Sequence, residues 1–157
     1  MCPQRIHRES LEQEATHVTD EARMILPGVQ AIMGFQLIAV FNQRFDSLGR
    51  FEQDLHLAAF FLVTLAMGLI MAPAAYHRQI ERGSVTRRFV DLASALLTLS
   101  LLPLLVGVAC DAFILLRLVG GTATNDLCGA GGVVAVLGGL WFVLPRLIGP
   151  QEGGPGR

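Results

Sequence analysis

The stretch "LASALLTLSLLPLLVGVACDAFILL", residues 92–116, holds one charged residue, Asp111, in an otherwise apolar or weakly polar run. A helix rises about 1.5 Å per residue, so roughly 20 residues cross the hydrocarbon core of a membrane. The apolar residues are continuous rather than alternating, which favours a helix over a barrel strand, and lipid leaves no partner for exposed backbone groups. The stretch therefore predicts a membrane-spanning helix.

Three further runs of the same kind lie on either side of it, at residues 24–41, 55–76 and 127–148. The whole chain is 52% hydrophobic and 16% charged, with a mean hydropathy of +0.52. That balance leaves too little polar surface for a soluble domain of this length. We predict an all-α integral membrane four-helix bundle over residues 24–148, with the lipid bilayer as its surroundings.

The arginines predict how the bundle is oriented, because basic residues near span ends stay on the cytoplasmic side. The chain has no lysine. Three arginines fall on one side of the predicted bundle, at positions 44, 50 and 117, and nine on the other, at positions 5, 8, 23, 78, 82, 87, 88, 146 and 157. Both termini are therefore expected in the cytoplasm, with the loops at 42–54 and 117–126 outside.

The segments beyond the spans differ in character. In residues 1–23 an apolar stripe runs along one helical face through Leu11, Ala15, Val18 and Ala22. Ser10 followed by Gln13 resembles a capping box. This pattern predicts a short amphipathic N-terminal cytoplasmic helix that contacts partner subunits or covers the inner end of the bundle. Residues 149–157 are rich in glycine and proline and are predicted to be a disordered tail.

Several polar residues near or within the spans are candidates for an ion or proton path, since intramembrane polar groups are costly to bury. They are Asp111, Gln30, Gln36, His56 and Asp91. In this interpretation Asp111 exchanges a proton for a cation. The alternative is structural: the amides hydrogen-bond to neighbouring helices, and Asp111 lies near the outer boundary of the membrane.

A second group marks the expected cytoplasmic interface: Arg23, Tyr76, His77 and Arg78. Aromatic rings and cations at headgroup depth are common anchors. Pro73, just before them, should bend the end of its helix. The alternative role for His77 is to sense or relay protons on this side.

Gly131, Ala135 and Gly139 form a small-residue stripe on the fourth span. Such stripes allow close helix approach, and we expect packing inside the bundle rather than a seam between subunits. Cys110 and Cys128 both lie toward the predicted outer side, where a disulfide is one possibility and two free thiols the other.

Enzymatic function is not expected, because the sequence has no P-loop, nucleotide-binding glycine motif, nucleophile elbow or H-E-x-x-H motif. Cysteines and histidines are not spaced as metal ligands, so no metal or other cofactor is predicted. The near-neutral charge and scattered arginines disfavour nucleic-acid binding.

Three motifs resemble those of a known family: "DEARMILPGVQAIMGF" (20–35), "NQRF" (42–45) and "MAPAAYHR" (71–78). They are similar to an uncharacterised bacterial family of small four-helix membrane proteins, some of whose members are labelled sodium:proton antiporter. The resemblance covers most of residues 20–117. It implies a multi-pass protein of the bacterial cytoplasmic (inner) membrane.

Two functional hypotheses follow. The first is cation or proton transport by a homo-oligomer, of the sodium:proton antiport type, since four helices give little room for two moving repeats in one chain. The second is a structural or accessory subunit that packs against a larger membrane complex.

Overall fold

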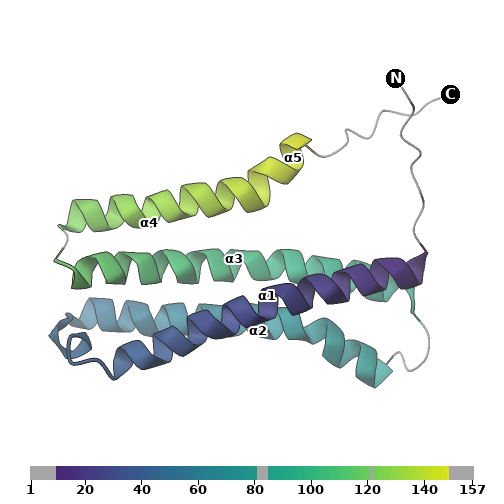
Figure 1. Cartoon of the computed structure of the whole chain (residues 1–157), viewed down its shortest axis with the longest axis horizontal. Helices are drawn as coiled ribbons and strands as arrows, with labels where there is room; N and C mark the ends of the chain where they lie inside the picture. The colour runs from purple at the N-terminus through teal and green to yellow at the C-terminus, as the bar shows by residue number, and fades with distance from the viewer. Residues whose placement is uncertain (1–9, 81–84, 121, 149–157) are drawn as a thin grey trace.

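The computed structural model describes residues 10–80, 85–120 and 122–148, which form a bundle of long helices (Figure 1). Predicted features in residues 1–9 and 149–157, including the C-terminal tail, lie outside the described residues. The elements in chain order are α1 (Leu11–Val40), a 3-10 turn η1 (Phe45–Ser47), α2 (Arg50–Ile80), α3 (Arg87–Leu118), α4 (Ala123–Gly138), a π-helical segment η2 (Gly139–Val143) and α5 (Leu144–Ile148). The last three form one continuous helical stretch.

Four helices are long and apolar enough to cross a membrane, which confirms the four predicted spans: Leu11–Val40, Arg50–Ile80, Arg87–Leu118 and Ala123–Ile148. Each starts or ends beyond the apolar run that predicted it. Hydropathy marks the part of a helix that suits lipid, whereas the backbone hydrogen bonding continues into the polar flanks.

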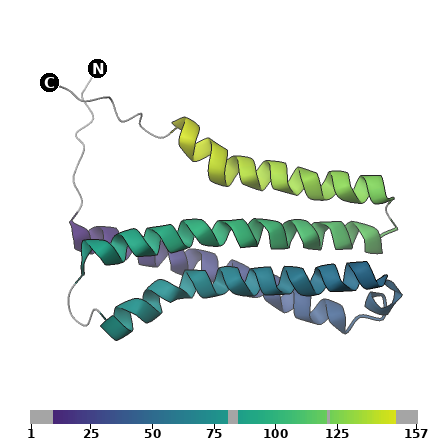
Figure 2. The same cartoon turned by 180° about the vertical axis from the view of Figure 1, so that it is seen from behind.

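α3 lies at the centre of the arrangement (Figures 1 and 2). α2 packs along it most extensively, α1 crosses the α2–α3 pair, and α4 lies on the opposite side of α3. We call the end with the α1–α2 and α3–α4 connections the loop end, and the end where α1 and α3 begin the terminal end.

The predicted short N-terminal helix is not a separate element, which corrects that part of the fold prediction. Residues 11–23 are the first turns of α1, which continues through Pro27 to Val40. Burial explains the difference, because Val18 packs against both the buried cluster that holds Ala15 and the one that holds Val29, so the apolar stripe continues without a break. Such packing can override the cost of an internal proline, about 3 kcal/mol. The predicted capping box is confirmed, with Ser10 and Gln13 bonding reciprocally.

The first turns of α1 pack on α3 at the terminal end. Ala15 joins a buried cluster with Phe89, Val90 and Ala93. Beside this cluster, the guanidinium Nη1 of Arg87 lies 2.7 Å from Glu14 Oε2. The segment therefore covers the end of its own bundle, one of the two roles expected for it.

The middle of the bundle is closed by a buried apolar cluster contributed by α1, α2 and α3: Val29, Val63, Ala66, Ile70, Leu97 and Leu104. Gly107 allows α3 to approach α2 closely here. A Cβ atom added at Gly107 would lie 2.8 Å from Val63 Cγ2 and 3.3 Å from the Ala59 carbonyl oxygen. No L-residue with a side chain fits without a shift.

The small-residue stripe on α4 does not pack inside the chain, contrary to the prediction. Gly131 and Ala135 are exposed, and a Cβ added at Gly131 or Gly139 would meet no atom within 4 Å. The face toward α3 instead includes Gly129, where an added Cβ would collide with the side chain of Leu116. The spacing of the glycines does not show which of two neighbouring faces of α4 packs against α3. The rotation of α4 about its own axis decides this, and it turns Gly129 toward Leu116.

Candidate functional site

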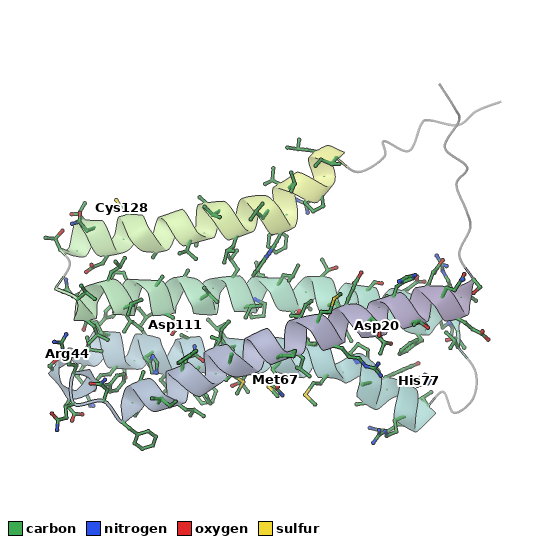
Figure 3. All side chains as sticks on the ribbon, in the orientation of Figure 1. Asp20, Arg44, Met67, His77, Asp111 and Cys128 are labelled. Carbon is green, nitrogen blue, oxygen red and sulfur yellow. The ribbon has the colours of Figure 1, made fainter. Side chains whose placement is uncertain are left out.

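Three of the five predicted path residues meet near the loop end, each from a different helix. Gln36 of α1 donates a hydrogen bond from Nε2 to Asp111 Oδ2 of α3, at 2.8 Å. His56 of α2 lies against both, with Nδ1 3.8 Å from Asp111 Oδ1. Gln36 and His56 are 3% and 6% exposed, and Asp111 is half-buried (Figure 3 labels Asp111). We call these three residues the Asp111 cluster.

The histidine ring is held in one orientation by the backbone of α1. His56 Nε2 lies 2.9 Å from the carbonyl oxygen of Gln36. A carbonyl has no proton to give, so Nε2 carries the hydrogen and donates. Nδ1, which faces Asp111, is then the ring nitrogen with the free lone pair. The ring also packs edge-on against Phe45, with centroids 5.2 Å apart.

One buried oxygen of the Asp111 cluster, Gln36 Oε1, lacks a hydrogen-bond donor among the described residues. The amide nitrogen of Gln36 is satisfied by Asp111, but Gln36 Oε1 is buried and accepts no hydrogen bond from the described residues. Buried acceptors are normally satisfied by a protein group, a water or an ion. Together with the carboxylate of Asp111, this oxygen supplies ligand atoms of the type that small hard cations bind.

A cavity of about 350 Å³ lies beside the cluster, between α1 and α2. Gln36 and His56 form part of its wall, and Asp54 adds a carboxylate. The other lining residues are Leu37, Val40, Phe45, Gln53, Leu57 and Phe60. The cavity gives small polar species a place next to His56.

The other two predicted path residues do not join the cluster. Gln30 is exposed on α1. Asp91 is exposed at the terminal end of α3, where its Oδ1 lies 3.5 Å from Arg87 Nε. Asp91 and Asp111 are twenty residues apart, or about 30 Å along a helix.

A second polar group at the loop end was not predicted. Arg117 of α3 lies between two carboxylates, with Nε 3.2 Å from Glu52 Oε1 and Nη1 3.4 Å from Asp126 Oδ2. Asp126 is fully buried, and its Oδ1 has no partner among the described residues. From the sequence, Arg117 was expected only to mark the outer side of the membrane. The sequence pattern that could have predicted this group is one acid in the first turn of each of α2 and α4 and an arginine in the last turn of α3, all at the same end of the bundle.

The two cysteines do not form the bond considered above. Both thiols are free, with Cys110 half-buried on α3 and Cys128 exposed on α4. Figure 3 shows Cys128 on the side of α4 away from α3. Within the described ranges, no three of the histidine, cysteine, aspartate and glutamate side chains are grouped closely enough to hold a metal ion.

The predicted interface residues gather at the terminal end. Arg23, His77 and Arg78 line a second cavity, of about 600 Å³, between α1 and α2. Tyr76 stacks on Phe89, with ring centroids 6.3 Å apart. The four residues therefore lie together at one end of the spans.

The four long apolar helices and their packing define a small multi-pass helical membrane protein. The chain belongs to a family of unknown function, DUF6328, whose family model matches residues 4–145. No curated protein and no solved structure matches the chain.

Proposed function

We propose that the protein exchanges protons for small cations at Asp111, with His56 as the neighbouring proton acceptor. The observation that carries this proposal is the meeting of Asp111, His56 and Gln36 from three helices, beside a cavity. Ionisable groups are rare inside membrane bundles and usually mark ion or proton pathways. The burial and fixed ring orientation of His56 favour a working pair over an incidental contact.

The exchange keeps the charge of the cluster constant. With a proton on His56 Nδ1 or on the Asp111 carboxylate, the net charge of the cluster is zero and no cation is bound. When that proton leaves through the cavity, the Asp111 carboxylate and Gln36 Oε1 offer oxygen ligands to one monovalent cation in its place. One proton is therefore released for each cation bound, as a proton–cation exchanger requires.

Transfer of the bound ion to the other side of the membrane requires a movement of the helices, because the path is closed in the structure of the single chain. The apolar cluster around Val63 and Leu104 lies between the Asp111 cluster and the terminal end. Ser100, a polar side chain fully buried between Leu97 and Leu104 of α3, donates its hydroxyl hydrogen to the Leu97 carbonyl of its own helix. The proposal therefore includes assembly of several chains, so that relative movement of helices opens the second side.

Reconstitution tests the proposal directly. The full chain in proteoliposomes should move protons in response to an imposed sodium or potassium gradient, read with a pH-sensitive dye inside the vesicles. Asp111→Asn should reduce the rate to that of protein-free vesicles. Asp91→Asn is the matched control, since it removes an exposed carboxylate from the same helix, and it should leave the rate unchanged. Wild-type flux at the background level, or full flux in Asp111→Asn, would refute the proposal.

A role as an accessory subunit is the second candidate, favoured by the open face of α4. Within the described residues α4 packs along α3 and makes no comparable contact with α1 or α2. Its exposed Gly131 and Ala135 permit close approach of another helix. Stable co-purification of one larger complex, lost in Ala135→Leu but kept in Leu127→Ala on an exposed position of the same helix, would favour this role.

A further inference from the structure

The larger cavity lies at the terminal end, in the opening between α1 and α2. The C-terminal part of α2 bends away from α3 in both views, as expected after Pro73, while the start of α1 lies against α3 (Figures 1 and 2). The cavity between them measures about 600 Å³, within the range of small-molecule sites. Its inner wall is apolar, formed mainly by Ala22, Ile70, Pro73 and Phe89.

The charged lining residues are ordered by depth along α1. Arg23 lies nearest the apolar run of this helix, with Asp20 one turn farther out and Glu12 farther still. At 1.5 Å per residue these carboxylates lie about 4.5 and 16 Å beyond Arg23. On α2, His77 and Arg78 follow directly on the apolar run. A positive layer therefore borders the apolar wall, and a negative layer lies outside it. The two layers meet where Arg23 Nη1 lies 3.6 Å from Asp20 Oδ1, so a zwitterionic headgroup would take up both charges of an exposed ion pair.

His77 contributes a polar atom that lacks a partner. Its Nδ1 is buried and has no hydrogen-bond partner among the described residues, while its ring lies against Phe89 with centroids 5.2 Å apart. His77 lines the cavity at the level of Arg23 and Arg78, in the positive layer. When Nδ1 carries the ring hydrogen, an acceptor oxygen at that depth would satisfy it.

From this layering we infer that the terminal-end cavity binds one membrane phospholipid whose headgroup carries a phosphate and, outside it, a primary ammonium, as in phosphatidylethanolamine. An acyl chain lies on the apolar wall, the phosphate meets Arg23, Arg78 and His77, and the ammonium meets the carboxylate of Asp20. Basic pockets between spans are known to hold lipid headgroups, and the outer carboxylates distinguish this one. The inference does not depend on proton or cation transport.

Native mass spectrometry of the purified full chain tests it, with phosphatidylethanolamine, phosphatidylglycerol and phosphatidylcholine of identical acyl chains. One phosphatidylethanolamine should be retained at least about fivefold more tightly than either of the others, equivalent to about one charged contact. Phosphatidylcholine cannot donate an N–H to Asp20, and phosphatidylglycerol has no cation.

Variants separate the two layers. Asp20→Asn should remove the preference for phosphatidylethanolamine, whereas Glu21→Gln, which changes an adjacent exposed acid outside the cavity, should retain it. Arg23→Gln should weaken all three lipids about fivefold, whereas Arg88→Gln, at the same end of the bundle, should not. Ala74→Phe should weaken all three by filling the cavity while every charge remains.

The outcomes are decisive in both directions. Equal retention of the three lipids, tighter binding of phosphatidylglycerol, or equal effects of Asp20→Asn and Glu21→Gln would each overturn the inference. Loss of binding in Ala74→Phe together with the expected lipid order would support it. Because the measurement is lipid retention, it is independent of whether the reconstituted protein transports ions.

Discussion

Gln36 and Asp111 are joined by a 2.8 Å hydrogen bond although 75 residues separate them in the chain. The bond links α1 to α3 close to the loop end, where α1 also contacts His56 of α2 through its backbone. Each partner holds another in place: the amide orients the carboxylate, and the α1 carbonyl orients the imidazole. The cluster is therefore a structural tie between three helices as well as the candidate site.

Because the Gln36–Asp111 hydrogen bond links α1 to α3, we expect Gln36→Leu to lower the free energy of unfolding. The substitution introduces an apolar side chain of similar size and removes the donor to Asp111. The free energy of unfolding should therefore fall by about 0.6–1.7 kcal/mol, the range of hydrogen bonds between membrane helices. Gln30→Leu, at an exposed position of the same helix, should change it by less than about 0.5 kcal/mol. Unfolding in mixed micelles by SDS titration measures both. Equal effects would mean that the Gln36–Asp111 bond contributes nothing.

Arg117 should be coupled energetically to Asp126. Arg117→Gln leaves the fully buried Asp126 carboxylate without its cation, and should cost about 2 kcal/mol, below the range for fully buried pairs because Arg117 is partly exposed. Asp126→Asn removes the charge instead. In the double variant Arg117→Gln/Asp126→Asn, stability should recover part of the loss, with an interaction energy of at least about 0.5 kcal/mol. Strict additivity in the same SDS titration would show that the pair is not coupled.

The spans were predictable from the sequence because membrane insertion depends on the length and hydropathy of a segment, which are local properties. The capping box at Ser10 and Gln13 was predictable for the same reason, since its partners are three residues apart. The continuation of α1 through Pro27 was not. Packing of Ala15 on α3 stabilises those turns, and that contact joins residues more than seventy positions apart.

The candidate site was predictable only as a list of residue types. Asp111, Gln36 and His56 were chosen because polar groups in spans are rare, but Gln30 and Asp91 satisfied the same criterion and lie elsewhere. Rotation of each helix about its axis and the depth at which helices cross decide which polar groups meet. The same uncertainty explains why the Gly131 stripe was expected inside the bundle and why Asp126 was missed.

Two glycines should respond in opposite ways to alanine. Gly107→Ala places a methyl group against Val63 and the Ala59 carbonyl, and this overpacking should cost about 1–3 kcal/mol, reduced by alanine's helix propensity of up to about 1 kcal/mol. Gly131→Ala meets open space and should be neutral or stabilising by up to about 1 kcal/mol. Unfolding titrations of the two variants give the comparison. Destabilisation of Gly131→Ala would instead indicate that a second helix occupies this face.

The thiols provide a simple check on the packing of α3 and α4. In a Cys2→Ser background, intact-mass measurement of the non-reduced protein should find both Cys110 and Cys128 free. A short maleimide pulse in detergent should modify the exposed Cys128 well before the half-buried Cys110. A mass two daltons lower, with no modification before reduction, would instead indicate a bond between them and a different rotation of α4 about its axis.

The side of the membrane to which the Asp111 cluster opens depends on orientation, which the arginine distribution predicts and cysteine labelling measures. With all three native cysteines replaced by serine, Ser47→Cys introduces a thiol at the loop end and Gln79→Cys one at the terminal end, both at exposed positions. Nine arginines against three favour a cytoplasmic terminal end. A membrane-impermeant maleimide added to intact cells should therefore label Ser47→Cys, and should label Gln79→Cys only after lysis. The reverse pattern would place the cavity beside His56 on the cytoplasmic side, so that protons would enter the proposed exchange from the cell interior. Labelling of both variants in intact cells would indicate mixed insertion, which the strong arginine bias argues against.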